Sequence, residues 1–186
     1  MCLSHPSGVW QPAPVTEHEQ TYYVSPGAHP AEVREQAAVA VLSTLRPRAR
    51  RAEVMAYCPD DLGPLPARAA TAVERITGGR PGIRARRRTG NLDLSDPVAW
   101  ATVEALAAWS AYTQLQDADG EDLAGFDNGW PFGLSLTPAE ASRVRDTLPS
   151  EAVLLSPEEA LVQVQDQMRK AKADMRSAFG QLLRRN

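Results

Sequence analysis

The stretch YTQLQDADGEDLAGFDNGWPFGLSL, residues 112–136, decides the fold class of this chain. Short apolar and alternating runs follow one another in it, at residues 111–116, 123–126 and 131–136. The segments between the runs, 117–120 and 127–129, contain Asp-x-Gly and Asn-Gly, which favour tight hairpin turns. The spacing therefore predicts a three-strand antiparallel meander.

Two helix starts follow the meander. Thr137 and Ser156 each precede a proline, and each is followed three residues later by a glutamate, which is the pattern of a capping box with proline at the first helical position. The second of these helices is expected to run to about residue 183. Its apolar residues recur every three or four positions: Leu161, Val164, Met168, Ala171, Met175, Phe179 and Leu182. This stripe predicts that residues 156–186 form an amphipathic helix, packed on the domain or on a second copy.

Upstream of the meander, strand and helix patterns alternate. Short β-prone runs are expected as strands at residues 21–24, 52–57 and 82–88, and the helical stripes lie at 30–45 and 66–77. A third helix is expected to open at Ser95, with Pro97 just inside it. This order predicts an α+β fold over residues 21–155, with a small mixed sheet and a βαβ-like N-terminal half. Residues 1–20 contain three prolines and are expected to form a flexible arm.

Charge is distributed unevenly along the 186 residues, although the total is only −3. Residues 46–90 hold eleven arginines and four acids, whereas residues 91–158 hold two arginines and twelve acids. Blocks of opposite sign either face each other within one domain or form separate surfaces for separate partners. The sequence alone leaves both interpretations open.

Some classes of protein do not fit the composition. No apolar run approaches 18 residues, so a transmembrane span is not expected. The first residues lack the basic and apolar regions of a secretory signal, and a cytoplasmic location is expected. The two cysteines and three histidines lack metal-ligand spacing. No motif for a cofactor is found, and neither a metal nor a cofactor is expected.

Catalysis by a cysteine is one hypothesis for the function. Cys58 follows a predicted strand and precedes a helix, which is where ligand and catalytic groups gather in α/β folds. However, Asp60 and Asp61 lie beside the thiol in sequence and oppose formation of the thiolate. Cys2 becomes an N-terminal nucleophile only if Met1 is removed, and no supporting motif follows it. An enzyme centred on Cys58 is therefore the third interpretation.

Protein interaction is the first interpretation. Acidic residues crowd the turns of the meander next to an aromatic residue, a composition typical of an interaction surface: Asp117, Asp119, Glu121, Asp122, Asp127 and Trp130. We therefore expect a non-catalytic interaction or regulatory protein with a protein partner, which the acids predict to be basic. A homo-oligomer through the C-terminal helix is compatible with this hypothesis.

Nucleic-acid binding is the second interpretation. The most concentrated basic feature of the chain contains four arginines within five residues: Arg84, Arg86, Arg87 and Arg88. Clustered arginines can bind phosphates. The segment lacks interleaved aromatic residues for base stacking, and the alternative is a solvated surface that offsets the acidic block.

Overall fold

The structure is a computed structural model, and it describes residues 19–25, 30–55, 64–77 and 88–163, together with 165, 166 and 169. It has the predicted α+β class. Apart from Glu19 and Gln20, the expected N-terminal arm lies outside the described residues. Among the helices that are described, none has the length and apolar character needed to cross a membrane.

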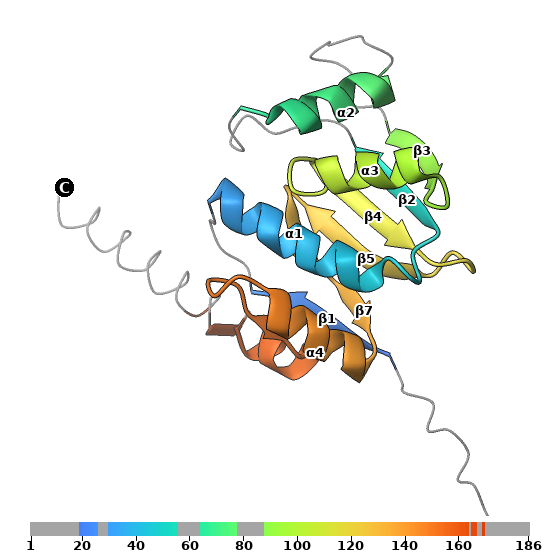
Figure 1. Ribbon diagram of the computed structural model, residues 1–186. Helices are drawn as coiled ribbons and strands as arrows, with labels where there is room; N and C mark the ends of the chain where they lie inside the picture. The colour runs from blue at the N-terminus through green and yellow to red at the C-terminus, as the bar shows by residue number, and fades with distance from the viewer. Residues whose placement is uncertain are drawn as a thin grey trace, which may run out of the picture.

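Eight strands are present in the described part of the chain (Figure 1). They are β1 (Gln20–Val24), β2 (Arg51–Met55), β3 (Arg88–Asp93), β4 (Tyr112–Gln116), β5 (Asp122–Asp127), β6 (Trp130–Phe132), β7 (Leu134–Leu136) and β8 (Leu154–Leu155). Five of them form a sheet in the order β3-β2-β4-β5-β6, and three form a sheet in the order β7-β1-β8. Every pairing is antiparallel, which corrects the expectation of a mixed sheet.

The N-terminal half does not form the expected βαβ-like arrangement, because its strands do not run parallel within one sheet. β1 and β2 lie in different sheets, so the helix between them is not a crossover within one sheet. β2 and β3 do pair directly, but in opposite directions. β3 also lies later than the strand expected at 82–88, of which only Arg88 is within the described residues.

The meander is confirmed, with one refinement at Gly133. β4, β5 and β6 are consecutive antiparallel neighbours, and the third predicted strand is split into β6 and β7. Phe132 is partly exposed, whereas Leu134 two residues later is fully buried, so the alternation of sides reverses between them. Gly133 has φ +56°, a left-handed conformation that glycine adopts readily. This residue therefore lets one stretch of chain pair in both sheets.

Four helices and the start of a fifth complete the described fold. They are α1 (Ala31–Leu45), α2 (Ala67–Thr77), α3 (Pro97–Leu106), α4 (Pro138–Thr147) and a helical segment at 157–163. Apart from residues 165, 166 and 169, the rest of the predicted C-terminal helix, including Met168, Met175 and Phe179, lies outside the described residues. Both capping boxes are confirmed: Thr137 and Glu140 cap α4, and Ser156 and Glu159 cap the fifth helix.

The start of α3 differs by one residue from the expectation. The Asp96 carboxylate, not Ser95, accepts a hydrogen bond from the Val98 N–H at 2.8 Å and caps the helix. The Ser95 hydroxyl instead donates to Asp93 at 2.8 Å. A carboxylate also interacts favourably with the partial positive charge of a helix N-terminus.

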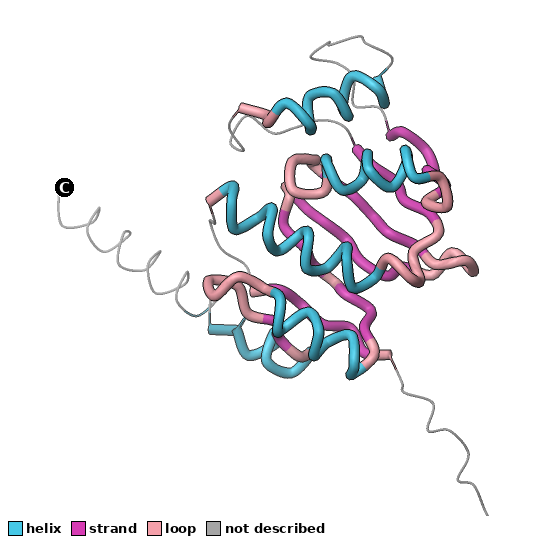
Figure 2. Tube along the Cα trace, viewed as in Figure 1, coloured by secondary structure: helices cyan, strands magenta, loops and turns pink. Residues whose placement is uncertain are grey.

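The helices α1, α3 and α4 lie on one side of the sheets (Figure 2). The strand side chains that alternate toward them are buried and form one core with the helices. The predicted stripe of α1 is buried, and further residues of this helix are buried beside it: Ala38, Ala40 and Leu42. Alanine is a strong helix former, and the burial of this side adds the tertiary packing that stabilises α1 in the fold.

The opposite side of the sheets carries a different set of side chains, which we call the open face. The register of the strands and the alternation of burial place these described residues on it: Tyr23, Arg51, Glu53, Met55, Asp93, Tyr112, Gln114, Gln116, Asp122, Gly125, Asp127, Trp130, Phe132 and Leu155. Aromatic and acidic residues dominate this set. Antiparallel sheets commonly bury one side only, and the two sheets of this protein follow that rule.

Candidate interaction surface

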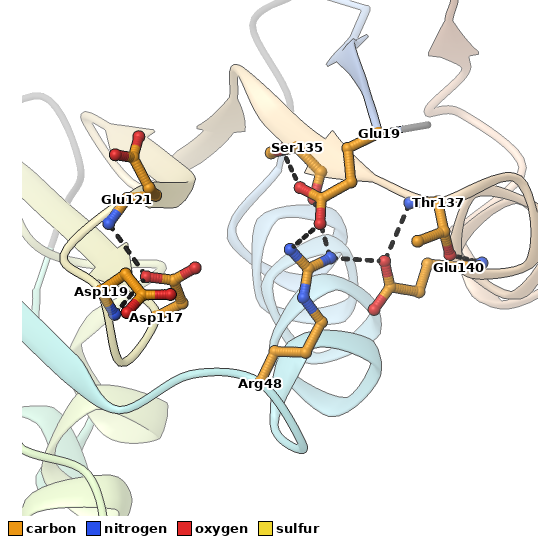
Figure 3. A network of polar contacts seen from close by, with 8 residues as sticks. All are labelled: Glu19, Arg48, Asp117, Asp119, Glu121, Ser135, Thr137 and Glu140. Atoms are coloured by element: carbon orange, nitrogen blue, oxygen red, sulfur yellow. Dashed lines mark hydrogen bonds and ion pairs between the residues drawn. The ribbon is translucent and has the colours of Figure 1, made fainter. Parts of the chain in front are cut away.

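The acidic turn, residues 117–122, connects β4 to β5 and is held by its own first carboxylate. The Asp117 Oδ1 atom accepts hydrogen bonds from the backbone N–H groups of Asp119 and Glu121, each at 2.9 Å. The Asp117 N–H also donates to the Glu121 carbonyl at 3.0 Å. One carboxylate therefore orders the loop. The side chains of Asp119, Glu121 and Asp122 are exposed (Figure 3 draws the first two).

Asp127 and Trp130 do not share this turn. They lie at the other end of β5, where Asn128 and Gly129 form the turn into β6. A strand of six residues is about 20 Å long, so the six predicted residues divide into two groups. Trp130 is half-buried and packs against the core.

A network around Arg48 lies beside the acidic turn (Figure 3). The Arg48 guanidinium donates to Glu140 Oε2 at 2.8 Å and to Glu19 Oε1 at 2.6 Å. The Ser135 hydroxyl donates to the other oxygen of Glu19 at 2.6 Å. Glu140 also accepts from the Thr137 N–H at 2.9 Å, so one carboxylate caps α4 and binds the arginine. The network joins the end of α1, the start of β1, β7 and α4.

These contacts bear on the two interpretations of the charge blocks. The ion pairs of Arg48 go to Glu19 and Glu140, and that of Arg68 goes to Glu35. None of these partners belongs to the acidic turn. Sequence reasoning missed the Arg48 network because its hydrogen-bonded partners are separated by up to 116 residues, and only the capping box at Glu140 could have marked one of them.

The electrostatics of Glu19 follow from the same contacts. The hydroxyl of Ser135 lowers the pKa of the Glu19 carboxyl most strongly; partial burial opposes this, and the Arg48 guanidinium adds to the lowering. A carboxyl whose pKa is lower in the folded state stabilises the fold above its unfolded pKa. That contribution is lost as the pH falls through the folded value.

The resulting pH dependence can be measured by thermal unfolding. We expect the melting temperature to fall as the pH is lowered from about 5 to about 3, because ordinary glutamates titrate near 4.3 and Glu19 titrates below that. Glu19→Gln should make this fall shallower. Glu158→Gln, at an exposed glutamate outside the network, should leave its slope unchanged. Identical slopes in wild type and Glu19→Gln would contradict the assigned role of Glu19.

A second polar cluster ties α1 to its neighbours. Glu35 Oε1 accepts from the Trp109 indole N–H at 2.9 Å and pairs with Arg68 of α2 at 2.8 Å. The Arg34 guanidinium lies over the Trp109 ring, 5.5 Å from its centre. Burial acts to raise the pKa of the Glu35 carboxyl, but Arg68 and Trp109 outweigh it and the pKa is lowered. Each of these side chains contacts another member of the cluster, so we infer that the cluster stabilises the packing of α1 against its neighbours.

A groove of about 500 Å³ lies at the edge of the open face. Tyr23, Trp130 and Phe132 line one side of it, and Pro157 and Leu161 of the fifth helix line the other. Tyr23 and Phe132 are each more than a third exposed, and Leu161 is 59% exposed. The alternation of residues along the strands is a sequence signal for such a surface. No pattern in the sequence indicates that the fifth helix lies beside it.

The other candidate residues lie mostly outside the described part of the chain. Cys2, Cys58, Arg84, Arg86 and Arg87 are among them, and of Arg88 only the backbone in β3 is described. Within the described residues, no three His, Cys, Asp or Glu side chains are grouped so that they could hold a metal ion.

Comparison of the chain with models of known protein families, with curated protein sequences and with solved structures finds no match. The function must therefore be argued from the surfaces themselves.

Proposed function

We propose that this chain is a non-catalytic interaction protein that presents its acidic turn to a basic protein partner. The observation that carries the proposal is the use of Asp117 as the internal brace of the turn, with the carboxylates of Asp119, Glu121 and Asp122 left exposed. An ordered group of like charges attracts an oppositely charged partner at long range and loses little conformational entropy on binding.

The location of the described arginines supports the same proposal. If the acidic turn existed only to neutralise the arginine block, ion pairs between the two would be expected. Arg48 and Arg68 instead pair with Glu19, Glu140 and Glu35. Arg51, whose strand position faces Gln116, lies close enough to lower the pKa of Asp93, although the Ser95 hydroxyl and N–H are the larger causes of that shift.

Reversing two charges of the turn tests the proposal. Asp119→Lys combined with Asp122→Lys should slow association with a partner recovered by pull-down by about tenfold at low salt, and less at high salt. The melting temperature should stay nearly unchanged, because Asp117 still braces the turn. The measurement is the association rate by surface plasmon resonance over a series of salt concentrations.

The matched control is Asp146→Lys combined with Glu151→Lys. These exposed acids lie on α4 and after it, and the double change alters the net charge by the same amount. An equal slowing in both variants would mean that net charge, not the acidic turn, guides the partner. A large loss of stability in the first variant would instead favour internal pairing of the turn.

A further inference from the structure

The exposed apolar side chains of this protein gather around β8 and the start of the fifth helix. We propose that this surface, which contains the groove described above and a second groove beside it, docks a segment of another protein in which apolar side chains are flanked by lysine or arginine. The proposal does not depend on the acidic turn having a partner.

The first observation is where the exposed apolar side chains lie. Large apolar side chains of the described chain are exposed at seven positions, and five of these line the two grooves: Tyr23, Phe132, Val153, Leu161 and Val162. The other two, Val39 and Val98, lie on α1 and α3. Single apolar residues scattered over a surface need no explanation, whereas a group of them gathered in one place marks a contact surface.

The second observation is that the two grooves adjoin. The groove of about 500 Å³ at the edge of the open face and the second groove, of about 660 Å³, have Leu155 of β8 and Gln163 of the fifth helix in common. Leu161 and Val162 are consecutive, yet Leu161 lines the first groove and Val162 the second. The fifth helix therefore stands between the grooves, and a docked segment can place apolar side chains in both.

The third observation is that hydrogen bonds hold the walls of the grooves in place. The Ser25 N–H donates to the Val153 carbonyl at 2.8 Å, and the Val153 N–H donates to the Ser25 hydroxyl oxygen at 3.1 Å. The Ser156 N–H donates to Glu159 at 2.8 Å and fixes the start of the fifth helix. A surface that is already ordered loses little conformational entropy when a partner binds.

Charge is the fourth observation. Within the described chain, the charged side chains that line the two grooves are all acidic: Asp127, Glu158, Glu159 and Asp166. Asp166 pairs with Arg169. Hydrogen bonds from Ser156 lower the pKa of the Glu159 carboxyl, and Arg145 adds a smaller lowering. Even with both arginines counted, the charge of this surface is negative.

The occupant follows from the two remaining acids. Asp127 and Glu158 are exposed, and neither forms an ion pair with any residue that the structure describes. A lysine or arginine of a docked segment gives these carboxylates partners at the rim of the contact, while its apolar neighbours fill the grooves. A second copy is a poorer occupant, because a symmetric contact through this surface would bring the acids of both copies together.

Selection of peptides on the full chain tests the proposal. A displayed library of random peptides is enriched on the wild-type protein, and the enriched peptides are then sorted by their binding to Leu161→Lys. This variant should fold as the wild type does, because the Leu161 side chain is 59% exposed. We expect the peptides that it loses to carry lysine or arginine beside apolar residues. Val98→Lys makes the same change in net charge on α3 and should retain these peptides.

Two results of the selection would overturn the proposal. If every enriched peptide binds Leu161→Lys as well as it binds the wild type, the grooves are not a docking surface. If the peptides that are lost carry no excess of basic residues, or if Val98→Lys loses them too, the partner does not have the proposed chemistry. Melting curves of both variants establish that they are folded.

The dissociation constant of one synthesised peptide from the selection tests the role of charge. Glu158→Lys should raise this constant about tenfold at low salt, and less at high salt, because it reverses a carboxylate at the rim. Glu104→Lys is the matched control, since Glu104 is an exposed glutamate of α3. It should change the constant by about twofold or less. Equal effects would mean that net charge, not Glu158, attracts the peptide.

The same peptide separates this inference from the proposed function. The double variant of the acidic turn, Asp119→Lys with Asp122→Lys, should bind it within about a factor of three of the wild type. If the peptide instead binds Leu161→Lys normally and binds the turn variant weakly, the acidic turn is its site. The inference then fails while the proposed function stands.

Sedimentation without peptide tests for a second copy on the grooves. We expect the wild type and Leu161→Lys to have the same molecular mass. A dimer of the wild type that Leu161→Lys splits into monomers would overturn the proposal, because a second copy would then occupy the grooves.

Discussion

Replacing Gly129 with alanine is expected to lower the free energy of unfolding by about 3–5 kcal/mol, at the upper end of single-residue effects. Two costs coincide at this residue. Its φ of +75° is unfavourable for any residue with a Cβ atom, and the added Cβ would lie 2.1 Å from the carbonyl oxygen of Ala108. Because Ala108 contributes backbone there, a rotamer change cannot relieve the clash.

The matched control is Gly120→Ala in the acidic turn. Gly120 has φ +89°, but no atom lies within 4 Å of an added Cβ. This variant should therefore lose only the conformational cost of about 1–2 kcal/mol. Denaturant unfolding of both variants gives the comparison. If both lost the same amount, the turn from β5 to β6 would move away from the end of α3 at little cost.

Replacing Glu140 with alanine is expected to lower the free energy of unfolding by about 2–3 kcal/mol. The Glu140 side chain is only 6% exposed, and its removal leaves the Thr137 N–H without its acceptor and Arg48 with one carboxylate fewer. Removing one partner of a buried ion pair costs about 3–5 kcal/mol, and the partial exposure of Arg48 reduces that figure. Chemical denaturation measures the change.

Glu159→Ala separates the capping contribution from the buried pair. Glu159 forms the same capping box at the start of the fifth helix, but its carboxylate is exposed. This variant should leave the melting temperature nearly unchanged. Comparable losses at Glu140 and Glu159 would mean that capping, not the contact with Arg48, accounts for the effect.

Local signals in the sequence predicted the elements that depend on neighbouring residues. The capping boxes at Thr137 and Ser156 are confirmed because each requires only four consecutive residues. The turn at Asn128 and Gly129 is confirmed for the same reason, since both residues have the positive φ that Asn-Gly favours. The α+β class followed from the order of these local elements.

Pairings between distant residues could not be predicted in the same way. β1 pairs with β7 and β8, and no pattern in the sequence of β1 predicts either pairing. At Gly133 the side of the chain that faces the core changes, and this change could be predicted only if the strand order of both sheets were known. Arg48 likewise gains its partners only when the ends of α1 and β1 meet α4. The acidic turn was found as a local pattern, but its distance from Trp130 depends on the extended course of β5.

The central position of β1 in the three-stranded sheet has a consequence for synthesis on the ribosome. Tyr22 pairs with Leu134, which is added 112 residues later. At translation rates of about 5–20 residues per second, β1 waits about 6–22 s for its first partner, and Leu155 follows later still. β1 is thus completed only by strands that are made much later, so this sheet cannot close before Leu155 has been synthesised. Until then the apolar side of β1, with Tyr22 and Val24, depends on contacts other than its native strands.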